Sequence, residues 1–381
     1  MKASLTLLDK SLTLLRYPPQ LQHPSWQAWD AADEYLIEYV QSLPSYSAQS
    51  TISIYNDDFG ALACWFAAHH ISWISDSFVA RQSCLMNLTK NGLQTDTIRF
   101  NHCLDLIETP SDIVLIKVPK TTALLEQQLI ALQNIVTPTT QIIAAGKILA
   151  IQKSTLALFE KYLGPTTTSL AKKKARLIFC QPTTTLKHNS PYPTVWSTEK
   201  PEFRLINHAN VFSRQQLDIG ARFMLEHLPK VGNKTLIDLG CGNGVLGLHV
   251  LHNNQQARVI FVDESYMAID SARENIKNNL PDALTRCDFI VSNCLDEYLQ
   301  NSRYEPVDFV LCNPPFHQQN TITDHIALQM FSDAKKALTS GGELIIVGNR
   351  HLDYPAKLKR MFGGVKHTAS NQKFSIYTAT K

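Results

Sequence analysis

The sequence has no Cys-x-x-Cys pair, although eight cysteines are scattered along its 381 residues. Zinc sites and redox motifs need cysteines or histidines at short, regular spacings, and the pair His69-His70 has no partner at such a spacing. We therefore expect neither a bound metal nor a disulfide framework. Long apolar runs are also missing, since no stretch reaches the roughly 18 residues that a membrane-spanning helix needs. Asp9 and Lys10 interrupt the N-terminal apolar stretch before it reaches signal-peptide length, so the simplest interpretation is a cytoplasmic protein without membrane contact.

An excess of one charge is missing as well. The chain has 36 Lys and Arg against 33 Asp and Glu, a net charge of +3, which neither indicates nor excludes a nucleic-acid partner. A hydrophobic content of 44% with 18 Pro and 15 Gly excludes disordered, collagen-like and coiled-coil chains. Because one hydrophobic core rarely serves a chain of this length, we expect two domains.

Several prolines and threonines without apolar periodicity indicate a linker over residues 182–202, between domains at 1–181 and 203–381. In the second domain, short β-branched runs alternate with amphipathic stretches. This order predicts an α/β fold with a doubly wound, mainly parallel sheet. Strands are expected at 235–239, 258–262, 289–291, 307–312 and 343–347, and helices at 244–253, 266–279 and 322–338.

The first half repeats the order of the second. Residues 51–55 align with 235–239, and the alignment places Gly60 on Gly244. Further along, 112–115 align with 308–311. We infer two tandem domains of one fold.

The first copy lacks two of the three glycines of the second. Asn56 and Asp58 stand where the second half has Gly240 and Gly242, so the loop that would admit a ligand is lost from the first copy. We therefore predict a degenerate N-terminal domain that binds no cofactor. Lys117 and Lys120 replace Asn313 and Phe316, and we expect these two cations to contact phosphate instead.

The run Asp238-Leu239-Gly240-Cys241-Gly242-Asn243-Gly244 follows a predicted strand and opens a predicted helix. Glycines at such a turn let a ligand approach the backbone, as dinucleotides do. Asp263 ends the next strand, where a carboxylate suits ribose hydroxyls. These features alone fit both NAD and S-adenosylmethionine (SAM). The spacing Asp238-x-Gly240-x-Gly242-x-Gly244 resembles the SAM loop of class I methyltransferases more than a dinucleotide motif.

The fourth predicted strand ends in Asn313-Pro314-Pro315-Phe316, at the sheet edge where such folds carry out their chemistry. An exocyclic amine on a base is a poor nucleophile because its lone pair is delocalised into the ring. The Asn313 side-chain oxygen and the Pro314 carbonyl can both accept its N–H groups. Successive prolines stiffen the turn and remove competing donors, and Phe316 can stack on the base. We predict that Asn313, Pro314 and Phe316 act on the substrate.

Together these motifs resemble the bacterial ribosomal RNA guanine-N2 methyltransferases of the RsmC/RlmG type. That family pairs a degenerate methyltransferase-like domain with a catalytic one. Residues 207–214 and 312–319 resemble the family's blocks on either side of the glycine loop, and the likeness extends to 28–35, 115–120 and 349–354. It is greatest to members that act on the large ribosomal subunit.

The resemblance implies two tandem Rossmann-like methyltransferase domains, SAM as cofactor, and methylation of a specific guanine N2 in 23S ribosomal RNA (rRNA). We also expect a monomer without an obligate protein partner. Asp218 and Gly220 would border the methionine end of SAM, Asp263 would hold the ribose, and Asn293 would lie near the adenine. The implied cofactor site is completed by Asp238, Gly240, Cys241, Gly242 and Gly244.

The densest positive run is Lys172-Lys173-Lys174-x-Arg176. Such a run is often a solvated face, but in an RNA enzyme it would bind phosphates without reading sequence. We predict RNA contacts for Lys172, Lys173, Lys174, Arg176 and Arg214.

Other functions remain open on the motifs alone. The Asn-Pro-Pro-Phe turn also suits a 16S rRNA guanine-N2 methyltransferase, or an enzyme that methylates protein glutamine or DNA adenine. A NAD-dependent oxidoreductase would use the glycines but leave the turn unexplained. A non-enzymatic RNA-binding protein would leave the glycines without purpose.

Overall fold

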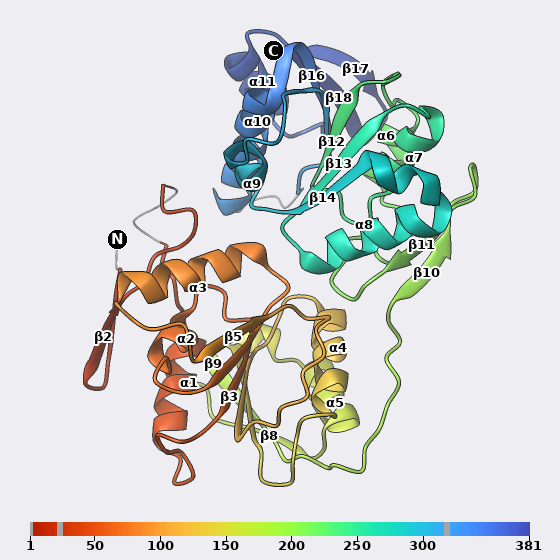
Figure 1. The fold of residues 1–381 in the computed structure, drawn as a ribbon. Helices are drawn as coiled ribbons and strands as arrows, with labels where there is room; N and C mark the ends of the chain where they lie inside the picture. Colours follow the sequence, from red (N-terminus) through yellow and green to blue (C-terminus); the bar gives the residue numbers. More distant parts are fainter. Residues whose placement is uncertain (1–2, 21–25, 316–320) are drawn as a thin grey trace. The chain divides into compact units, whose positions relative to one another are not determined.

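The computed structural model describes residues 3–20, 26–315 and 321–381. The chain divides into two compact units, Met1–Pro191 and Tyr192–Lys381. Each unit has its own seven-stranded sheet with helices packed on both faces (Figure 1). The α/β class and the two tandem doubly wound domains expected from the sequence are confirmed.

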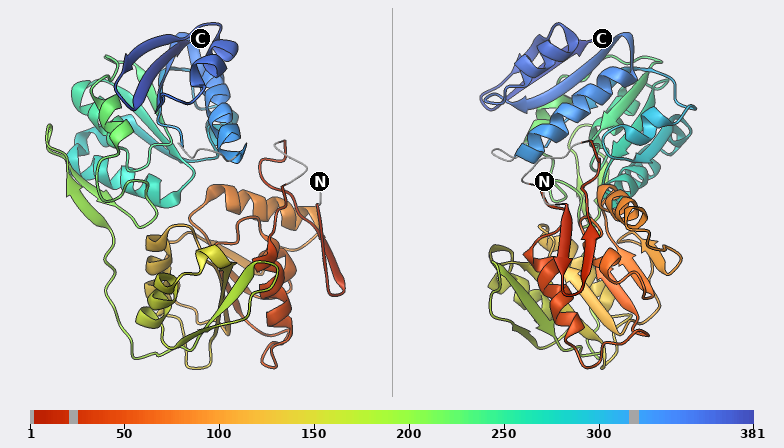
Figure 2. Two further views of the ribbon diagram at one scale, coloured as in Figure 1. Left: turned by 180° about the vertical axis from the view of Figure 1, so that it is seen from behind. Right: turned by 90° about the vertical axis from the view of Figure 1, so that its left-hand side faces the viewer.

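The sheet of the N-terminal unit has the strand order β5-β4-β3-β6-β7-β9-β8, in which β9 is antiparallel to both of its neighbours. Its strands are β3 (Ile52–Tyr55), β4 (Ile71–Ile74), β5 (Ile98–Asn101), β6 (Ile113–Lys117), β7 (Gln141–Lys147), β8 (Thr166–Thr168) and β9 (Ala175–Cys180). Its helices are α1 (Ala31–Gln41), α2 (Ala61–Trp65), α3 (Phe78–Lys90), α4 (Thr122–Leu132) and α5 (Lys153–Tyr162). A separate hairpin of β1 (Ser4–Leu7) and β2 (Lys10–Thr13) precedes them (Figure 2).

The sheet of the C-terminal unit has the equivalent order, β14-β13-β12-β15-β16-β18-β17. Its strands are β12 (Thr235–Leu239), β13 (Arg258–Asp263), β14 (Cys287–Val291), β15 (Val307–Cys312), β16 (Leu338–Asn349), β17 (Lys366–Ser370) and β18 (Phe374–Thr380). Its helices are α6 (Ile219–Leu225), α7 (Val245–Asn253), α8 (Tyr266–Asn279), α9 (Asp296–Gln300), α10 (Thr321–Ala337) and α11 (Tyr354–Phe362).

Equivalent hydrogen bonds in the two units confirm the internal repeat. The Thr51 backbone N–H donates to the Asp112 carboxylate at 2.8 Å, and the Thr235 N–H donates to Asp308 at 3.1 Å. These four positions are the ones that the sequence alignment pairs. Gly60 and Gly244 cap α2 and α7 in the same left-handed conformation, with φ of 80° and 75°.

Two apolar cores sandwich the C-terminal sheet. One lies under α6, α7 and α8 and includes Leu246, Ile269 and Phe374. The other lies under α9, α10 and α11 and includes Phe331 and Leu358. Burying side chains on both faces leaves the carboxyl edge of the parallel strands as the place where loops and polar groups meet.

Part of the expected linker is ordered as a strand. β10 (Thr194–Ser197) pairs antiparallel with β11 (Arg204–Asn207), and both belong to the C-terminal unit. Trp196 fastens this hairpin by donating from its indole N–H to the Arg214 carbonyl at 3.1 Å. The hairpin therefore leads directly into the loop before α6.

Candidate active site

The glycine loop joins β12 to α7 and folds as its residue types predict. Gly240, Gly242 and Gly244 all have positive φ, at 71°, 54° and 75°. A side chain at Gly244 would come within 2.9 Å of the Ala272 Cβ atom, so this glycine allows α7 and α8 to pack. At Gly242 an added Cβ would meet nothing within 4 Å. The space over Gly242 therefore fits a ligand that approaches the backbone closely.

Asp263 ends β13 beside this loop. Its carboxylate accepts hydrogen bonds from the Gly242 N–H at 2.9 Å and from the Ser265 N–H at 3.0 Å. Burial raises the pKa of Asp263, while these backbone donors oppose the shift. The carboxylate thus joins the glycine loop to the first turn of α8, and each oxygen still has a lone pair for a ribose hydroxyl.

Asp238, in β12, and Cys241, within the loop, are both buried. The Asp238 carboxylate accepts from the Gly247 N–H at 2.9 Å, so it holds the first turn of α7. Burial raises the pKa of Asp238 to about 7, and the nearby charge of Asp263 acts in the same direction. Burial also raises the pKa of the Cys241 thiol well above its usual value.

Three buried asparagines support the loop, and no sequence motif links them. The Asn243 amide donates to Asn207 at 2.9 Å, and Asn275 donates to the Asn243 carbonyl at 2.9 Å. Asn275 also exchanges hydrogen bonds with the backbone of Ile206 in β11. Because these residues are far apart in sequence, only the fold brings them together.

Asn313 follows β15 and lies next to Asp218 and Gly220. Its amide Nδ2 donates to the Asp218 carboxylate at 3.2 Å, while its Oδ1 is buried and has no partner among the described residues. A Cβ at Gly220 would lie 3.5 Å from this Oδ1 and 3.0 Å from the Asp218 oxygen, so Gly220 keeps the spot open. Pro314 is buried directly after Asn313. Phe316 lies outside the described residues, and its predicted stacking role stays a prediction.

Asn293 follows β14 in a turn that opens α9. Its side chain donates to Asp296 at 2.8 Å, and its carbonyl accepts from the Asp296 N–H at 3.0 Å. The neighbouring Ser292 N–H donates to the Asp263 carbonyl at 2.9 Å. Through Ser292, Asn293 is therefore linked to Asp263 beside the glycine loop. Its contact with adenine stays a prediction.

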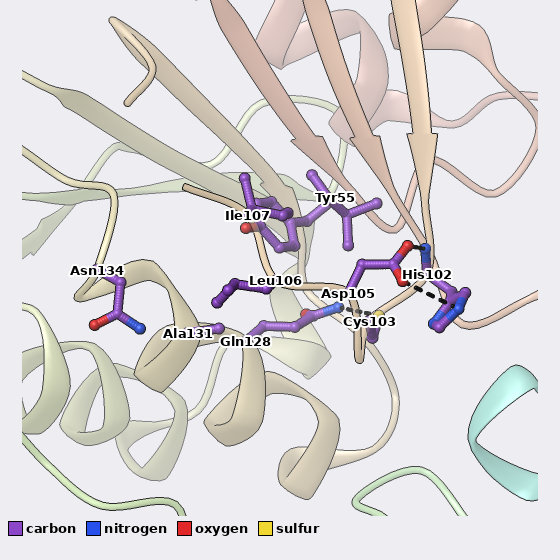
Figure 3. Close-up of a pocket in the computed structure, with 10 residues that line it drawn as sticks. Tyr55, His102, Cys103, Asp105, Leu106, Ile107, Gln128, Ala131 and Asn134 are labelled. Carbon is purple, nitrogen blue, oxygen red and sulfur yellow. Dashed lines mark hydrogen bonds and ion pairs between the residues drawn. The ribbon is translucent and has the colours of Figure 1, made fainter. Parts of the chain in front are cut away.

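The corresponding corner of the N-terminal domain is filled by side chains. Asn56 has φ of 59° at the position aligned with Gly240, and its amide exchanges two hydrogen bonds of 2.8 Å with Gln128. Gln128 also contacts the Cys103 sulfur and lines a pocket beside Tyr55 (Figure 3). Two paired side-chain amides thus stand where the second domain has a glycine.

The expectation that Lys117 contacts phosphate is wrong. Lys117 is buried, and its ammonium lies 2.9 Å from Asp30 and 2.7 Å from Asp33. Burial alone would lower the pKa of Lys117, but the carboxylates of Asp33 and Asp30 raise it. The lysine therefore neutralises acidic groups inside the domain. Lys120, three residues later, is exposed.

The predicted RNA-binding lysines lie in the turn before β9. Lys172 and Lys173 form ion pairs with Glu38 and Glu34 of α1, whereas Lys174 is exposed. Arg176 and Arg214 are partly buried, and each has an Nε without a partner in the described part of the chain. The Arg214 guanidinium lies over the Tyr192 ring, 5.5 Å from its centroid.

Across residues 3–20, 26–315 and 321–381, no three His, Cys, Asp or Glu side chains are grouped so that they could hold a metal ion. Within the same ranges, no helix combines the length and apolar character needed to cross a bilayer.

Known sequences match the chain along its whole length. The model of the RLMG N-terminal domain matches residues 2–184, and that of the methyltransferase small domain matches residues 202–378. A Pseudoalteromonas atlantica protein named ribosomal RNA large subunit methyltransferase G is 62% identical, and the alignment covers 100% of both chains. The chain belongs to the ribosomal RNA large subunit methyltransferase G family. Relatives of the same name from Aeromonas hydrophila and Vibrio vulnificus are 54% and 48% identical over 99% and 100% of both chains.

One solved structure has the same two-domain architecture. It is the Thermus thermophilus 16S rRNA N2 G1207 methyltransferase (RsmC) in complex with AdoMet and guanosine. The TM-score is 0.77 at 19% identity, covering 100% of this chain and 99% of that one. At this identity the likeness concerns the fold alone.

Proposed function

We propose that this protein transfers a methyl group from SAM to the exocyclic N2 of a specific guanine in 23S rRNA. The single observation that carries the proposal is the Asn313 amide, held by Asp218 so that its buried Oδ1 has no partner within the described fold. An unsatisfied buried acceptor is costly unless a ligand donates to it. An amine with two N–H groups suits this position.

The reaction needs an amine that has been made nucleophilic. The Asn313 Oδ1 and the Pro314 carbonyl accept the two N2–H groups and draw the nitrogen lone pair out of conjugation with the ring. With SAM bound, the N2–CH3 bond would form as the sulfur–CH3 bond breaks, leaving the sulfur neutral. One N2 proton would then leave to solvent by way of the acceptor that holds it. Fixed acceptors of this kind act through orientation and electrostatics, where alignment alone supplies about 7 to 11 kcal/mol.

The cofactor site proposed for SAM is the glycine loop with its flanking residues. SAM supplies an electrophilic methyl group on a positively charged sulfur. The positive φ of Gly240 and the open space over Gly242 would let it approach the backbone, and Asp263 would accept from its ribose hydroxyls. Asp218 and Gly220 would border its methionine end, and Asn293 would lie near its adenine.

The choice of 23S over 16S rRNA rests on the names of the full-length relatives, which are 48% to 62% identical. The 16S enzyme with the same architecture is 19% identical. We assign RNA docking to the N-terminal domain through Lys172, Lys173, Lys174 and Arg176, and to Arg214 in the catalytic domain. Lys174 is the best placed of the lysines, because Lys172 and Lys173 already have acidic partners. The acting form in this proposal is a cytoplasmic monomer.

The decisive experiment uses 23S and 16S rRNA from a strain that lacks this protein. Wild-type protein with SAM is expected to add N2-methylguanine to one position of 23S rRNA, detected by mass spectrometry of nuclease fragments. Asn313→Ala is expected to lower the rate at least about a hundredfold while SAM affinity, measured by calorimetry, stays within about threefold. Asn253→Ala is the control, because Asn253 is exposed at the end of α7, away from the glycine loop. Methylation of 16S instead of 23S, or wild-type turnover by Asn313→Ala, would overturn the assignment.

A further inference from the structure

A second buried acceptor in the C-terminal domain lacks a partner. Asn349 is the last residue of β16, and its Oδ1 is buried without a hydrogen bond from any described residue. Within the described part of this domain, Asn313 and Asn349 are the two residues whose side-chain oxygens are in this state. Most buried acceptors in folded proteins are satisfied, so two in one domain call for a common explanation.

The two residues end neighbouring parallel strands. β15 and β16 pair so that Cys312 lies opposite Ile346, which places Asn313 and Asn349 together at the carboxyl edge of the sheet. Side chains alternate between faces along a strand, so Asn349 shares the face of Val347, and Asn313 shares the face of Leu311. Val347 and Leu311 belong to the same core under α6. Both acceptors therefore lie on the α6 face.

Phe374 links the two acceptors more closely. It is the antiparallel strand partner of Asn349, and directly opposite residues on one face have Cβ atoms about 4.5 to 5.5 Å apart. The Phe374 ring lies 3.4 Å from the Cβ position built on Gly220, and the Asn313 Oδ1 lies 3.5 Å from the same point. Asn349, Phe374, Gly220 and Asn313 thus border one small region beside α6.

A guanine presents two neighbouring donors on its Watson–Crick edge, the N2 amine and the ring N1–H. Asn313 accepts from the amine in the reaction proposed above. We propose that Asn349 accepts the N1–H of the target guanine through its Oδ1 and thereby selects guanine over purines without that hydrogen. Adenine and 2-aminopurine both carry a lone pair at N1, which would face the Asn349 oxygen and leave it unsatisfied. This inference rests on the proposed function.

The test compares two RNA substrates with the full-length protein. One is a 23S rRNA fragment that the wild-type protein methylates, and the other carries 2-aminopurine at the target position. 2-Aminopurine keeps the N2 amine but lacks the N1–H. The wild-type protein is expected to favour guanine in kcat/KM by roughly tenfold to a hundredfold, because a site built to pair a polar group discriminates against an analogue that lacks it.

Asn349→Ala is expected to reduce that preference to within about threefold, with SAM affinity and thermal midpoint unchanged, because the Oδ1 accepts no hydrogen bond from the described residues. Asn349→Asp keeps an acceptor oxygen and is expected to retain the preference for guanine. Asn253→Ala, altered at an exposed helix end, is expected to behave as the wild type.

The outcomes separate the two proposals. If Asn349→Ala slows both substrates equally and the preference persists, Asn349 has a structural role and the inference is wrong. A wild-type protein that does not discriminate between the two bases also overturns the inference, while leaving the methyltransferase assignment intact. A wild-type protein that methylates no 23S rRNA overturns the proposed function itself.

Discussion

Asn313 and Asp218 are joined by a hydrogen bond of 3.2 Å from the Asn313 amide nitrogen to the Asp218 carboxylate. The same carboxylate oxygen caps α6 by accepting from the Ala221 N–H at 2.8 Å. Because a carboxylate only accepts, it requires the nitrogen of the Asn313 amide to face it and turns the oxygen away. The N-cap of one helix thus sets the direction of the proposed catalytic acceptor.

Asp218→Ala should therefore lower methyl transfer by roughly tenfold or more, since Asn313 is then free to rotate its amide. Loss of the cap should also cost about 1 kcal/mol of stability. Asp218→Asn keeps an oxygen that can accept from both partners and should retain more of the turnover number. The measurement is kcat for both variants at saturating SAM. Equal losses in the two variants would show that Asp218 does not act through the orientation of Asn313.

Asp263→Ala should weaken SAM binding at least about tenfold. The substitution removes the acceptor proposed for the ribose and also releases the Gly242 and Ser265 N–H groups that shape the loop. Isothermal calorimetry of the purified protein measures the effect. Asp288→Ala is the matched control, because it removes a carboxylate from the adjacent strand β14, where Asp288 forms a partly exposed ion pair with Arg258. Unchanged affinity of Asp263→Ala would remove the ribose assignment.

Asp238→Asn should change how stability depends on pH. Burial raises the pKa of Asp238 to about 7, against about 4 in an unfolded chain. Between these values the folded state binds more protons than the unfolded state, so the wild-type protein loses stability as pH rises through this window. Asparagine does not titrate and still offers an oxygen to the Gly247 N–H.

The free energy of unfolding of this variant, relative to wild type, should therefore increase from pH 4 to pH 7 by on the order of 2 kcal/mol and level off above pH 8. Denaturant titrations of both proteins without SAM, at a series of pH values, provide the comparison. A difference that does not vary with pH would mean that burial does not raise the pKa of Asp238.

Lys117→Ala should destabilise the N-terminal domain by about 3 to 5 kcal/mol, because it leaves the carboxylates of Asp30 and Asp33 without their buried counter-charge. Lys120→Ala removes the same charge from an exposed position nearby and should be neutral in stability. Calorimetric melting of the two variants distinguishes the cases. Similar melting of both would contradict the structural role of Lys117.

The sequence predicted the limits of strands and helices correctly where local residue types determine them. Strands 235–239 and 307–312 and the helix at 266–279 have the predicted limits, because glycine, proline and apolar periodicity mark them locally. The hairpin β10–β11 and the antiparallel strands β17 and β18 were not predicted. Residues 366–370 of β17 are mostly exposed and show no apolar periodicity. They form a strand by pairing with β18, which the local sequence does not indicate.

In the site, too, local motifs could be predicted from the sequence and long-range contacts could not. The glycine loop and the Asn313 turn are local motifs, and the sequence located them. The buried position of Lys117 and the network of Asn207, Asn243 and Asn275 depend on residues tens of positions apart. Lys117 ends β6, whereas its partners Asp30 and Asp33 lie at the start of α1, so no local pattern distinguishes this buried lysine from an exposed one.

The proposed roles of the two domains, SAM binding by the C-terminal one and RNA docking by the N-terminal one, can be separated with a fragment of the chain. A fragment starting at residue 203 would remove β10 and leave β11 unpaired, whereas one starting at Tyr192 keeps the whole C-terminal unit.

Residues 192–381 alone should bind SAM with an affinity within about threefold of the full chain, because every described residue proposed for SAM lies within them. RNA affinity and methylation of 23S rRNA should fall at least about tenfold, because the fragment loses the phosphate contacts proposed for Lys174 and Arg176. Filter binding and methyl transfer, each at several salt concentrations, measure the change. A fragment that methylates the same guanine at the full rate would mean that the N-terminal domain serves another purpose than docking RNA.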